Sequence, residues 1–254
     1  VAVVLALSSA APHLVLAEPD YPQVEAVSGG SNTLVTSHNV SLPAGVSAGD
    51  LLLVFFSVYG TPTSIDWPAG WSLLGWFGNS DVSSQACYRI ADGSESSTVV
   101  VDTNITTSSA YTSYRITGYC RLPESAGLSY GAATVSPDPP ECTPSWGEDD
   151  TLWIAAAGYG NGQTTVSSYP SGYSSGRNDR TGSVEGVGVG SASLQSNVSS
   201  EDPGAFTLSS AQRWTAMTVA IAPCEAPPAQ PLAVGGEACR VDKNALLVPW
   251  ILLV

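Results

Sequence analysis

Two histidines are the side chains in this 254-residue chain best suited to act as a general base near neutral pH. A nucleophilic triad needs such a histidine beside a serine or cysteine, together with a carboxylate that orients the imidazole ring. His13 lies in an apolar N-terminal stretch, and His38 lies on an expected strand with one wet face. No nucleophile-elbow motif is near either histidine. The sequence therefore predicts no acyl-transfer enzyme.

The five cysteines lack the spacing of a zinc site, because none falls in a C-x-x-C pair. Cys120 and Cys142 flank one connection of the chain, and Cys224 and Cys239 flank another that is rich in proline. We predict that each pair forms a disulfide, which leaves Cys87 as a free thiol or as the partner of a thiol on another chain. The alternative is that the cysteines are buried and unpaired.

Acidic residues gather in expected turns, at 92–95, 148–150 and 201–202. A glycosidase needs two carboxylates that face each other across the substrate, and nothing in the sequence pairs these turns. The runs at 92–95 and 148–150 could bind Ca²⁺ through oxygen ligands, but turn chemistry explains them equally well. No phosphate-binding or dinucleotide-binding glycine pattern is present. We therefore predict a non-enzymatic protein without a cofactor, with calcium at one of these turns as the alternative.

Aromatic residues form a candidate binding surface. Its members are Trp67, Trp71, Trp76, Tyr169 and Tyr173. The simpler interpretation is that these rings close the ends of a hydrophobic core. The alternative is that they form a platform for a sugar.

Three asparagines match the acceptor pattern for N-linked glycans. They are Asn39, Asn104 and Asn197. Such matches also arise by chance in a chain rich in serine and threonine, so they predict modification only in a host that attaches glycans.

The element that would position these residues is the apolar stretch Leu51–Tyr59, which is bounded by glycine at both ends. This pattern predicts a central strand that is covered on both faces. A turn follows at Trp67–Trp71, where we expect Pro68 to set φ at the first corner and Gly70 to supply a positive φ at the second. A similar apolar stretch recurs at 150–160, and a turn with proline and glycine between two aromatic residues follows it at 169–173. The sequence therefore predicts an internal repeat of about 100 residues.

Short apolar runs between turn signals predict an all-β fold. We expect a jelly-roll-like β-sandwich of about ten strands over 24–223, with repeat halves at about 29–122 and 127–223. Two small sandwiches in tandem are the alternative. Two segments flank the sandwich: an apolar N-terminal extension at 1–23, and a proline-rich linker with an apolar tail at 224–254.

The chain is acidic but sparsely charged, with a formal net charge of −14 and 12% charged residues. Its charge would repel nucleic-acid phosphates, so we expect no nucleic-acid partner. The apolar N-terminal run is too short for a membrane span, and we predict none. Apolar ends on an acidic β module indicate instead segments that lodge in neighbouring subunits. The alternative is that both ends fold back on their own core.

A set of motifs in a fixed order connects this chain with a known family. The motifs are, in order, Gly49–Val54, Trp67–Trp71, Tyr88–Gly93, Tyr114–Gly118, Asp150–Ala155, Glu201–Phe206 and Trp214. In this order the chain resembles, from Val24 to Pro223, a family of predicted virion proteins of tailed phages and environmental viruses. The resemblance implies a β-rich particle component, such as a head-decoration or tail-associated protein, and it supplies no catalytic residues. The two ends depart from the family and would also suit a secreted subunit that polymerises.

The sequence thus predicts a structural subunit on a virion surface or elsewhere outside the cell, whose partners are copies of itself and other particle subunits. One alternative is the subunit of a secreted filament that polymerises by β-strand donation. The other is a β-sandwich module that binds surface glycans through its aromatic residues.

Overall fold

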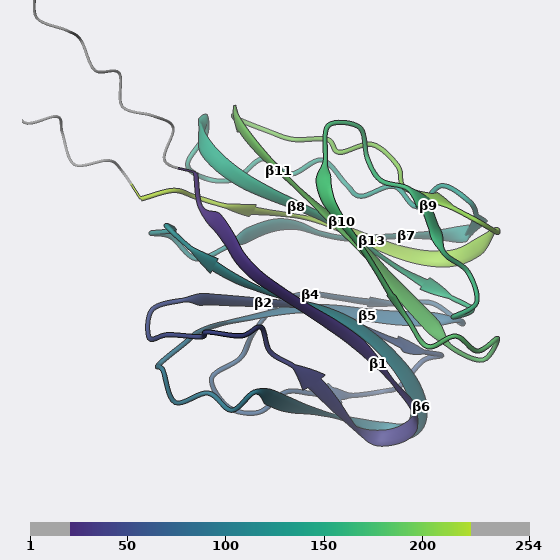
Figure 1. The fold of residues 1–254 in the computed structure, drawn as a ribbon. Coiled ribbons are helices and arrows are strands. Elements are labelled where there is room, and N and C mark those ends of the chain that lie inside the picture. The colour runs from purple at the N-terminus through teal and green to yellow at the C-terminus, as the bar shows by residue number, and fades with distance from the viewer. Residues whose placement is uncertain (1–20, 225–254) are drawn as a thin grey trace, which may run out of the picture.

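The computed structural model describes residues 21–224, and these residues form an all-β fold with antiparallel strands. Two large sheets lie face to face, as expected for a β-sandwich (Figure 1). The described residues contain thirteen strands rather than about ten. The difference arises because short pieces beside the turns pair as strands of two or three residues.

The first sheet, sheet 1, has the strand order β1-β6-β2-β5-β4, and the short β3 pairs with β6. Its strands are β1 (Gln23–Ser41), β2 (Leu51–Tyr59), β3 (Ile65–Asp66), β4 (Ser72–Gly78), β5 (Val82–Ile90) and β6 (Thr98–Thr117). Strand β2 is buried at eight of its nine positions, which agrees with the covered central strand that its composition predicts.

The second sheet, sheet 2, has the strand order β10-β11-β8-β13-β7, and a separate two-stranded sheet joins β12 to β9. The strands are β7 (Glu124–Thr134), β8 (Asp149–Gly160), β9 (Val166–Ser168), β10 (Ser174–Arg180), β11 (Val187–Val198), β12 (Thr207–Leu208) and β13 (Gln212–Ile221). When sheet 2 is read from its β7 edge, each strand has a counterpart at the same place in sheet 1. The central β2 corresponds to β8, and the edge strand β4 corresponds to β10.

The main core lies between the two sheets. It contains Leu51, Leu53, Phe55, Val82, Ala86, Ala110, Tyr114, Ile116, Leu152, Ile154, Ala156, Val187, Val189, Met217, Val219 and Ile221. Tyr114 crosses this core, and its hydroxyl lies 2.7 Å from the hydroxyl of Ser191 on the facing sheet. The core therefore contains a polar link between the sheets within an apolar layer.

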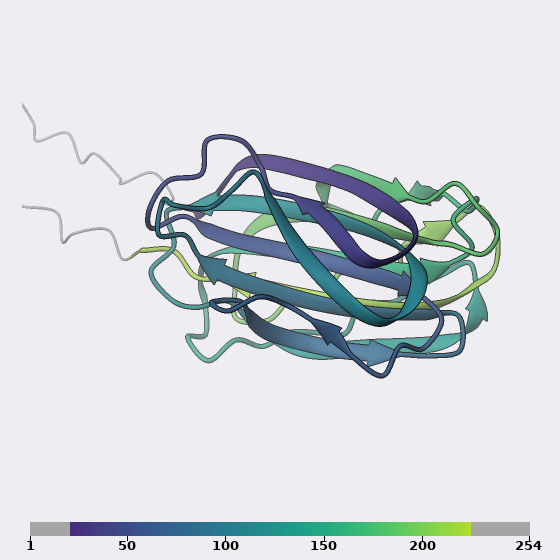
Figure 2. The same cartoon turned by 90° about the horizontal axis from the view of Figure 1, so that it is seen from below.

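Each sheet also buries apolar side chains on its outer face. On sheet 1 the outer cluster includes Phe56 of β2 and Val101 of β6. Strands β1 and β6 are long enough to run past the sheet and curl over this face (Figure 2). Irregular pairing near Asn32 and Val35 accompanies the curl. On sheet 2 Phe206 and Leu208 cover the outer face in a similar way.

The two aromatic turns differ in one detail from the expected geometry. The N–H of Trp71 donates to the carbonyl of Pro68 at 3.4 Å, so Pro68 precedes the two corner residues instead of being the first of them. Gly70 follows the prediction, because its φ of 91° is the left-handed value that glycine adopts most easily. The second turn repeats this arrangement, with a bond of 3.2 Å from Tyr173 N–H to the Pro170 carbonyl.

Candidate functional site

His38 is fully buried. The sequence predicted instead a strand with one solvent-exposed face at this position. Its Nδ1 lies 2.9 Å from Ser109 Oγ and its Nε2 lies 3.1 Å from Thr103 Oγ1. The Thr103 hydroxyl donates to the Ile105 carbonyl, so its oxygen is the acceptor for Nε2–H. Burial lowers the pKa of His38 to about 4, although Asp102 acts in the opposite direction. This imidazole joins the curled ends of β1 and β6, and no substrate could reach it.

The disulfide pairing differs from the predicted one. Cys120 is bonded to Cys224 and not to Cys142. The reason is the shared direction of β6 and β13, which end just before these two cysteines, so that Cys224 N–H donates to the Gly118 carbonyl at 3.1 Å. Position just after the last strand of each large sheet, β6 or β13, was therefore a better signal than distance along the chain. The other proposed partner, Cys239, lies outside the described residues.

The remaining described cysteines are free and buried. Cys142 packs with Trp153 and Ala220 on the outer side of sheet 2. Burial raises the pKa of its thiol to about 11, and burial raises that of Cys87 to about 12. Both cysteines are therefore protonated at neutral pH and poor nucleophiles.

The acidic turn at 92–95 is held together by its own hydrogen bonds. Glu95 accepts bonds from the backbone N–H of Asp92 at 2.8 Å and of Gly93 at 3.0 Å, and from Arg89 Nε at 3.0 Å. Burial alone would raise the pKa of Glu95, but the backbone donors outweigh it and the pKa is lowered. Within residues 21–224 no group of three histidine, cysteine or acidic side chains is arranged to hold a metal ion. Calcium binding stays a prediction.

The five candidate aromatic residues do not form one surface. Trp67 and Trp71 pack on the outer cluster of sheet 1, with ring centroids 4.9 Å apart. Tyr169 and Tyr173 pack on the outer cluster of sheet 2. Only Trp76 is strongly exposed, at 45% of its surface. The structure thus assigns four of the rings mainly to packing.

A shallow groove of about 350 Å³ lies beside Trp71. Its lining residues are Leu42, Pro68, Ala69, Trp71, Arg89, Ser94, Glu95, Ser96 and Val99. The charged groups in it are already engaged, because Arg89 binds Glu95, Asp92 and the Ala69 carbonyl. A ligand in this groove would therefore rely on the apolar surfaces of Trp71, Pro68 and Ala69.

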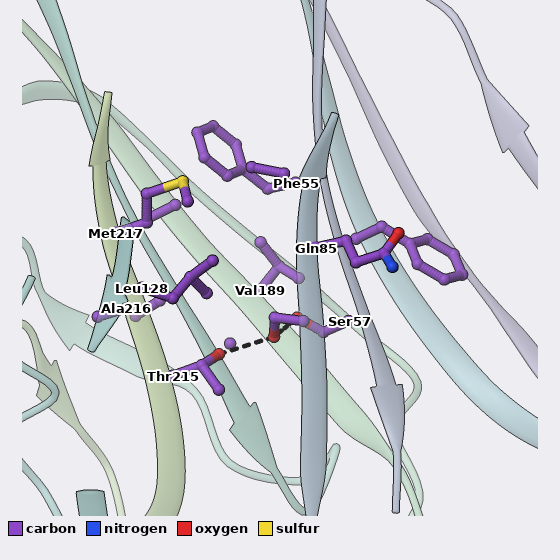
Figure 3. A pocket seen from close by; sticks show the side chains of 14 residues that line it. Phe55, Ser57, Gln85, Leu128, Val189, Thr215, Ala216 and Met217 are labelled. Atoms are coloured by element: carbon purple, nitrogen blue, oxygen red, sulfur yellow. Dashed lines mark hydrogen bonds between the residues drawn. The ribbon is translucent and has the colours of Figure 1, made fainter. Parts of the chain in front are cut away.

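An internal cavity of about 20 Å³ lies between the sheets (Figure 3). At one side the hydroxyls of Ser57, Ser84 and Thr215 form a chain, with both oxygen–oxygen distances at 2.7 Å. A Cβ on Gly158 would lie 2.3 Å from Ser84 Oγ, so this position leaves no room for a larger residue. The cavity has space for about one water molecule and none for an organic substrate.

The three asparagines of the glycan acceptor pattern are exposed. The side-chain carbonyl of Asn104 accepts bonds from Thr63 N–H at 2.8 Å and Ser64 N–H at 3.1 Å. The amide of Asn197 donates to Asp150 at 2.7 Å. A glycan on Asn197 would therefore compete with that bond, whereas Asn39 has its side chain at the surface. Modification at these positions stays a prediction.

Both ends of the described chain meet at one end of the sandwich, which we call the terminal pole (Figure 1). It comprises residues 21–23, 118–120 and 223–224. Gln23 pairs with Thr117, and Tyr119 forms a bridge with Pro223. The disulfide between Cys120 and Cys224 fixes this junction covalently. Tyr21 and Cys224, the two ends of the described chain, therefore lie close together at this pole, beside Gly118.

Comparison of the chain with protein-family models, with curated proteins and with solved structures gives no match. Residues 21–224 contain no helix that could cross a membrane.

Proposed function

We propose that this protein is a non-enzymatic structural subunit of an extracellular assembly, a virion surface protein of the decoration or tail-associated kind, held to its neighbours by its terminal segments. The observation that supports the proposal most is the terminal pole. The described chain ends at Tyr21 and Cys224, which both lie at this covalently fixed junction. The sequence beyond these ends contains uncharged apolar runs at 1–17 and 245–254. A subunit with both attachments at one pole can present the opposite pole to solvent.

Other features agree with this role. Three described side chains could in principle act as a base or a nucleophile, namely His38, Cys87 and Cys142. All three are buried and inaccessible to a substrate. The disulfide is compatible with an oxidising environment outside the cell. The net charge of −14 would keep separate subunits soluble until specific contacts form.

The finer description of the fold is part of the proposal. The matching strand orders of the two sheets support a unit of about 100 residues used twice. The same order argues for one sandwich in which each unit supplies a sheet, and against two tandem sandwiches. The jelly-roll description of this sandwich stays a prediction.

Deletion of residues 1–17 from the full chain tests the function. We expect the wild-type protein to form oligomers in sedimentation-velocity experiments and the shortened protein to stay a folded monomer with an unchanged circular dichroism spectrum. A matched control keeps the length and replaces Val3, Val4 and Leu5 by serine, which should also prevent assembly. A shortened protein that assembles like the wild type would disprove attachment through this segment.

A carbohydrate-binding module is the second candidate, and the exposure of Trp76 together with the groove at Trp71 favours it. A glycan array would test it directly. Specific binding that is lost in Trp71→Ala and Trp76→Ala, while the melting temperature is retained, would favour this candidate over the first.

A further inference from the structure

Strand β4 is an edge strand that lacks the usual protection against pairing with other chains. Among the described strands it pairs with β5 alone. No residue of Ser72–Gly78 is charged, and none is proline. Leu73 and Trp76 are exposed at 54% and 45% of their surfaces. An exposed apolar edge of this kind offers backbone donors and acceptors to any strand that approaches it.

The counterpart of β4 in sheet 2 provides an internal comparison. Strand β10 occupies the equivalent edge, but it carries Arg177, Asp179 and Arg180. Asp179 is tied to the other sheet by a 2.7 Å bond from Thr112. Charges on an edge are a common device that prevents unwanted strand addition. Because the two edges have equivalent positions, the absence of charge on β4 points to an edge that another strand covers.

The exposed side chains of β4 lie beside buried side chains on the outer face of sheet 1. Trp76 lies opposite Gln85 in the pairing of β4 with β5, so both side chains face outward on sheet 1. The side-chain carbonyl oxygen of Gln85, Oε1, accepts a 2.7 Å bond from Trp67 Nε1 within the outer cluster. Leu73 lies opposite Cys87, which is buried on that face. An added strand would extend this packed layer by one strand and cover Trp76 and Leu73.

The chain itself contains a segment that fits this edge. Val1–Leu7 is wholly apolar and has neither charge, proline nor glycine. The C-terminal run at 245–254 is less suitable, because Pro249 would interrupt a hydrogen-bonded strand. With a net charge of −14 on every subunit, an uncharged donor and an uncharged acceptor avoid the repulsion that most of the surface would cause.

Geometry allows the donation to occur between copies. The twenty residues before Tyr21 can span at most about 66 Å when extended. They start at the terminal pole, and the pairing registers across sheet 1 place Ser72 level with Val27, near the same pole. Two subunits whose poles are adjacent therefore bring the donor of one close to the acceptor of the other.

We propose that β4 of one subunit accepts Val1–Leu7 of a second copy as an additional strand. This inference rests on the proposed function, because it names the acceptor for the terminal segment. The added strand bonds to the free backbone edge of β4, and its apolar side chains pack on Trp76 and Leu73.

The test uses the full-length protein with the photoreactive amino acid p-benzoylphenylalanine in place of Trp76. Equal amounts of ¹⁴N-labelled and ¹⁵N-labelled protein are mixed, irradiated and digested with pepsin, and cross-linked peptides are identified by mass spectrometry. We expect peptides from the N-terminal segment linked to position 76, with the mixed isotope pattern that only two different copies can give. Cross-links within one copy, between two β4 strands, or to any other region of the assembly would overturn the proposal.

A second measurement uses charge at the edge. Leu73→Lys and Trp76→Lys should raise the dissociation constant of the assembly by about 10-fold or more, since lysine on an edge disfavours strand addition. Ser174→Lys on the equivalent edge β10 is the matched control and should assemble like the wild type. If the β4 variants assemble normally while the deletion of 1–17 still prevents assembly, the acceptor is wrong and the proposed function stands. If the wild-type protein is a monomer at every concentration, both fail.

Discussion

The carboxylate of Asp179 lies against the backbone of Gly29, so that an edge residue of sheet 2 contacts an edge residue of sheet 1. A Cβ atom on Gly29 would be 2.3 Å from Asp179 Oδ2. The carboxylate cannot move without loss, because Thr112 Oγ1 donates to it at 2.7 Å and Arg177 lies 3.3 Å from its other oxygen. This contact closes the side of the sandwich on which β1 and β10 lie (Figure 1).

Gly29→Ala should therefore destabilise the protein. The new methyl group would force Asp179 away from Thr112, and overpacking of this kind costs about 1–3 kcal/mol of unfolding free energy. Urea unfolding followed by circular dichroism would measure the loss. In an Asp179→Ala background the same substitution should cost much less, since the space is then free. Equal costs in both backgrounds would rule out the contact as the cause.

Acid should destabilise the fold through His38. In the unfolded chain the imidazole has an ordinary pKa of 6.5, whereas burial lowers the pKa to about 4 in the folded protein. Between these values the unfolded state binds the proton more readily than the folded state. The free energy of unfolding is therefore unaffected by this group above pH 6.5, and it falls as the pH decreases from 6.5 towards 4. The loss should reach about 3 kcal/mol, at 1.36 kcal/mol for each pKa unit.

The comparison of wild type with His38→Gln isolates this effect, because the carboxylates titrate in both proteins. Unfolding free energies from urea titrations at pH 7.5 and pH 4.5 would be compared. The wild type should lose more stability than the variant over this interval. Parallel losses would show that His38 is not the responsible group.

The sequence predicted the elements with strong local signals. Leu51–Tyr59 is a buried central strand because its apolar residues leave no wet face, and the turn at Trp67–Trp71 forms because Gly70 can adopt a positive φ. Both depend on residues that are adjacent in the chain. The all-β class followed from the repetition of such signals.

The features that the sequence did not predict depend on distant residues. His38 has polar neighbours in the sequence, and it is buried only because β1 and β6 curl over sheet 1 and bring Ser109 and Thr103 to its ring. Cys120 and Cys224 are separated by 104 positions, and their meeting requires that β6 and β13 end at one pole. The position of β4 at an edge follows only from the sheet order, because it depends on which strands pair.

Loss of the disulfide should weaken the sandwich considerably. The bond closes a loop between positions separated by 104 residues, and a loop of that length restricts the unfolded chain by about 4–5 kcal/mol in the chain-entropy model. Cys224→Ser should lower the unfolding free energy by an amount of this order. Reduced wild-type protein is the control and should match the variant. Wild-type protein that keeps its melting temperature after verified reduction of Cys120 would contradict the prediction.

The hydrogen bond between Tyr114 and Ser191 should reveal how much the polar link contributes to the core. Tyr114→Phe leaves the Ser191 hydroxyl buried without its partner, which costs about 1–3 kcal/mol. The double variant with Ser191→Ala removes both polar groups, so it should recover most of this loss. Thermal and urea unfolding of the wild type, both single variants and the double variant give the coupling energy. If the double variant is as unstable as the sum of the two single variants, the two hydroxyls do not stabilise each other, and this polar link adds nothing to the stability of the core.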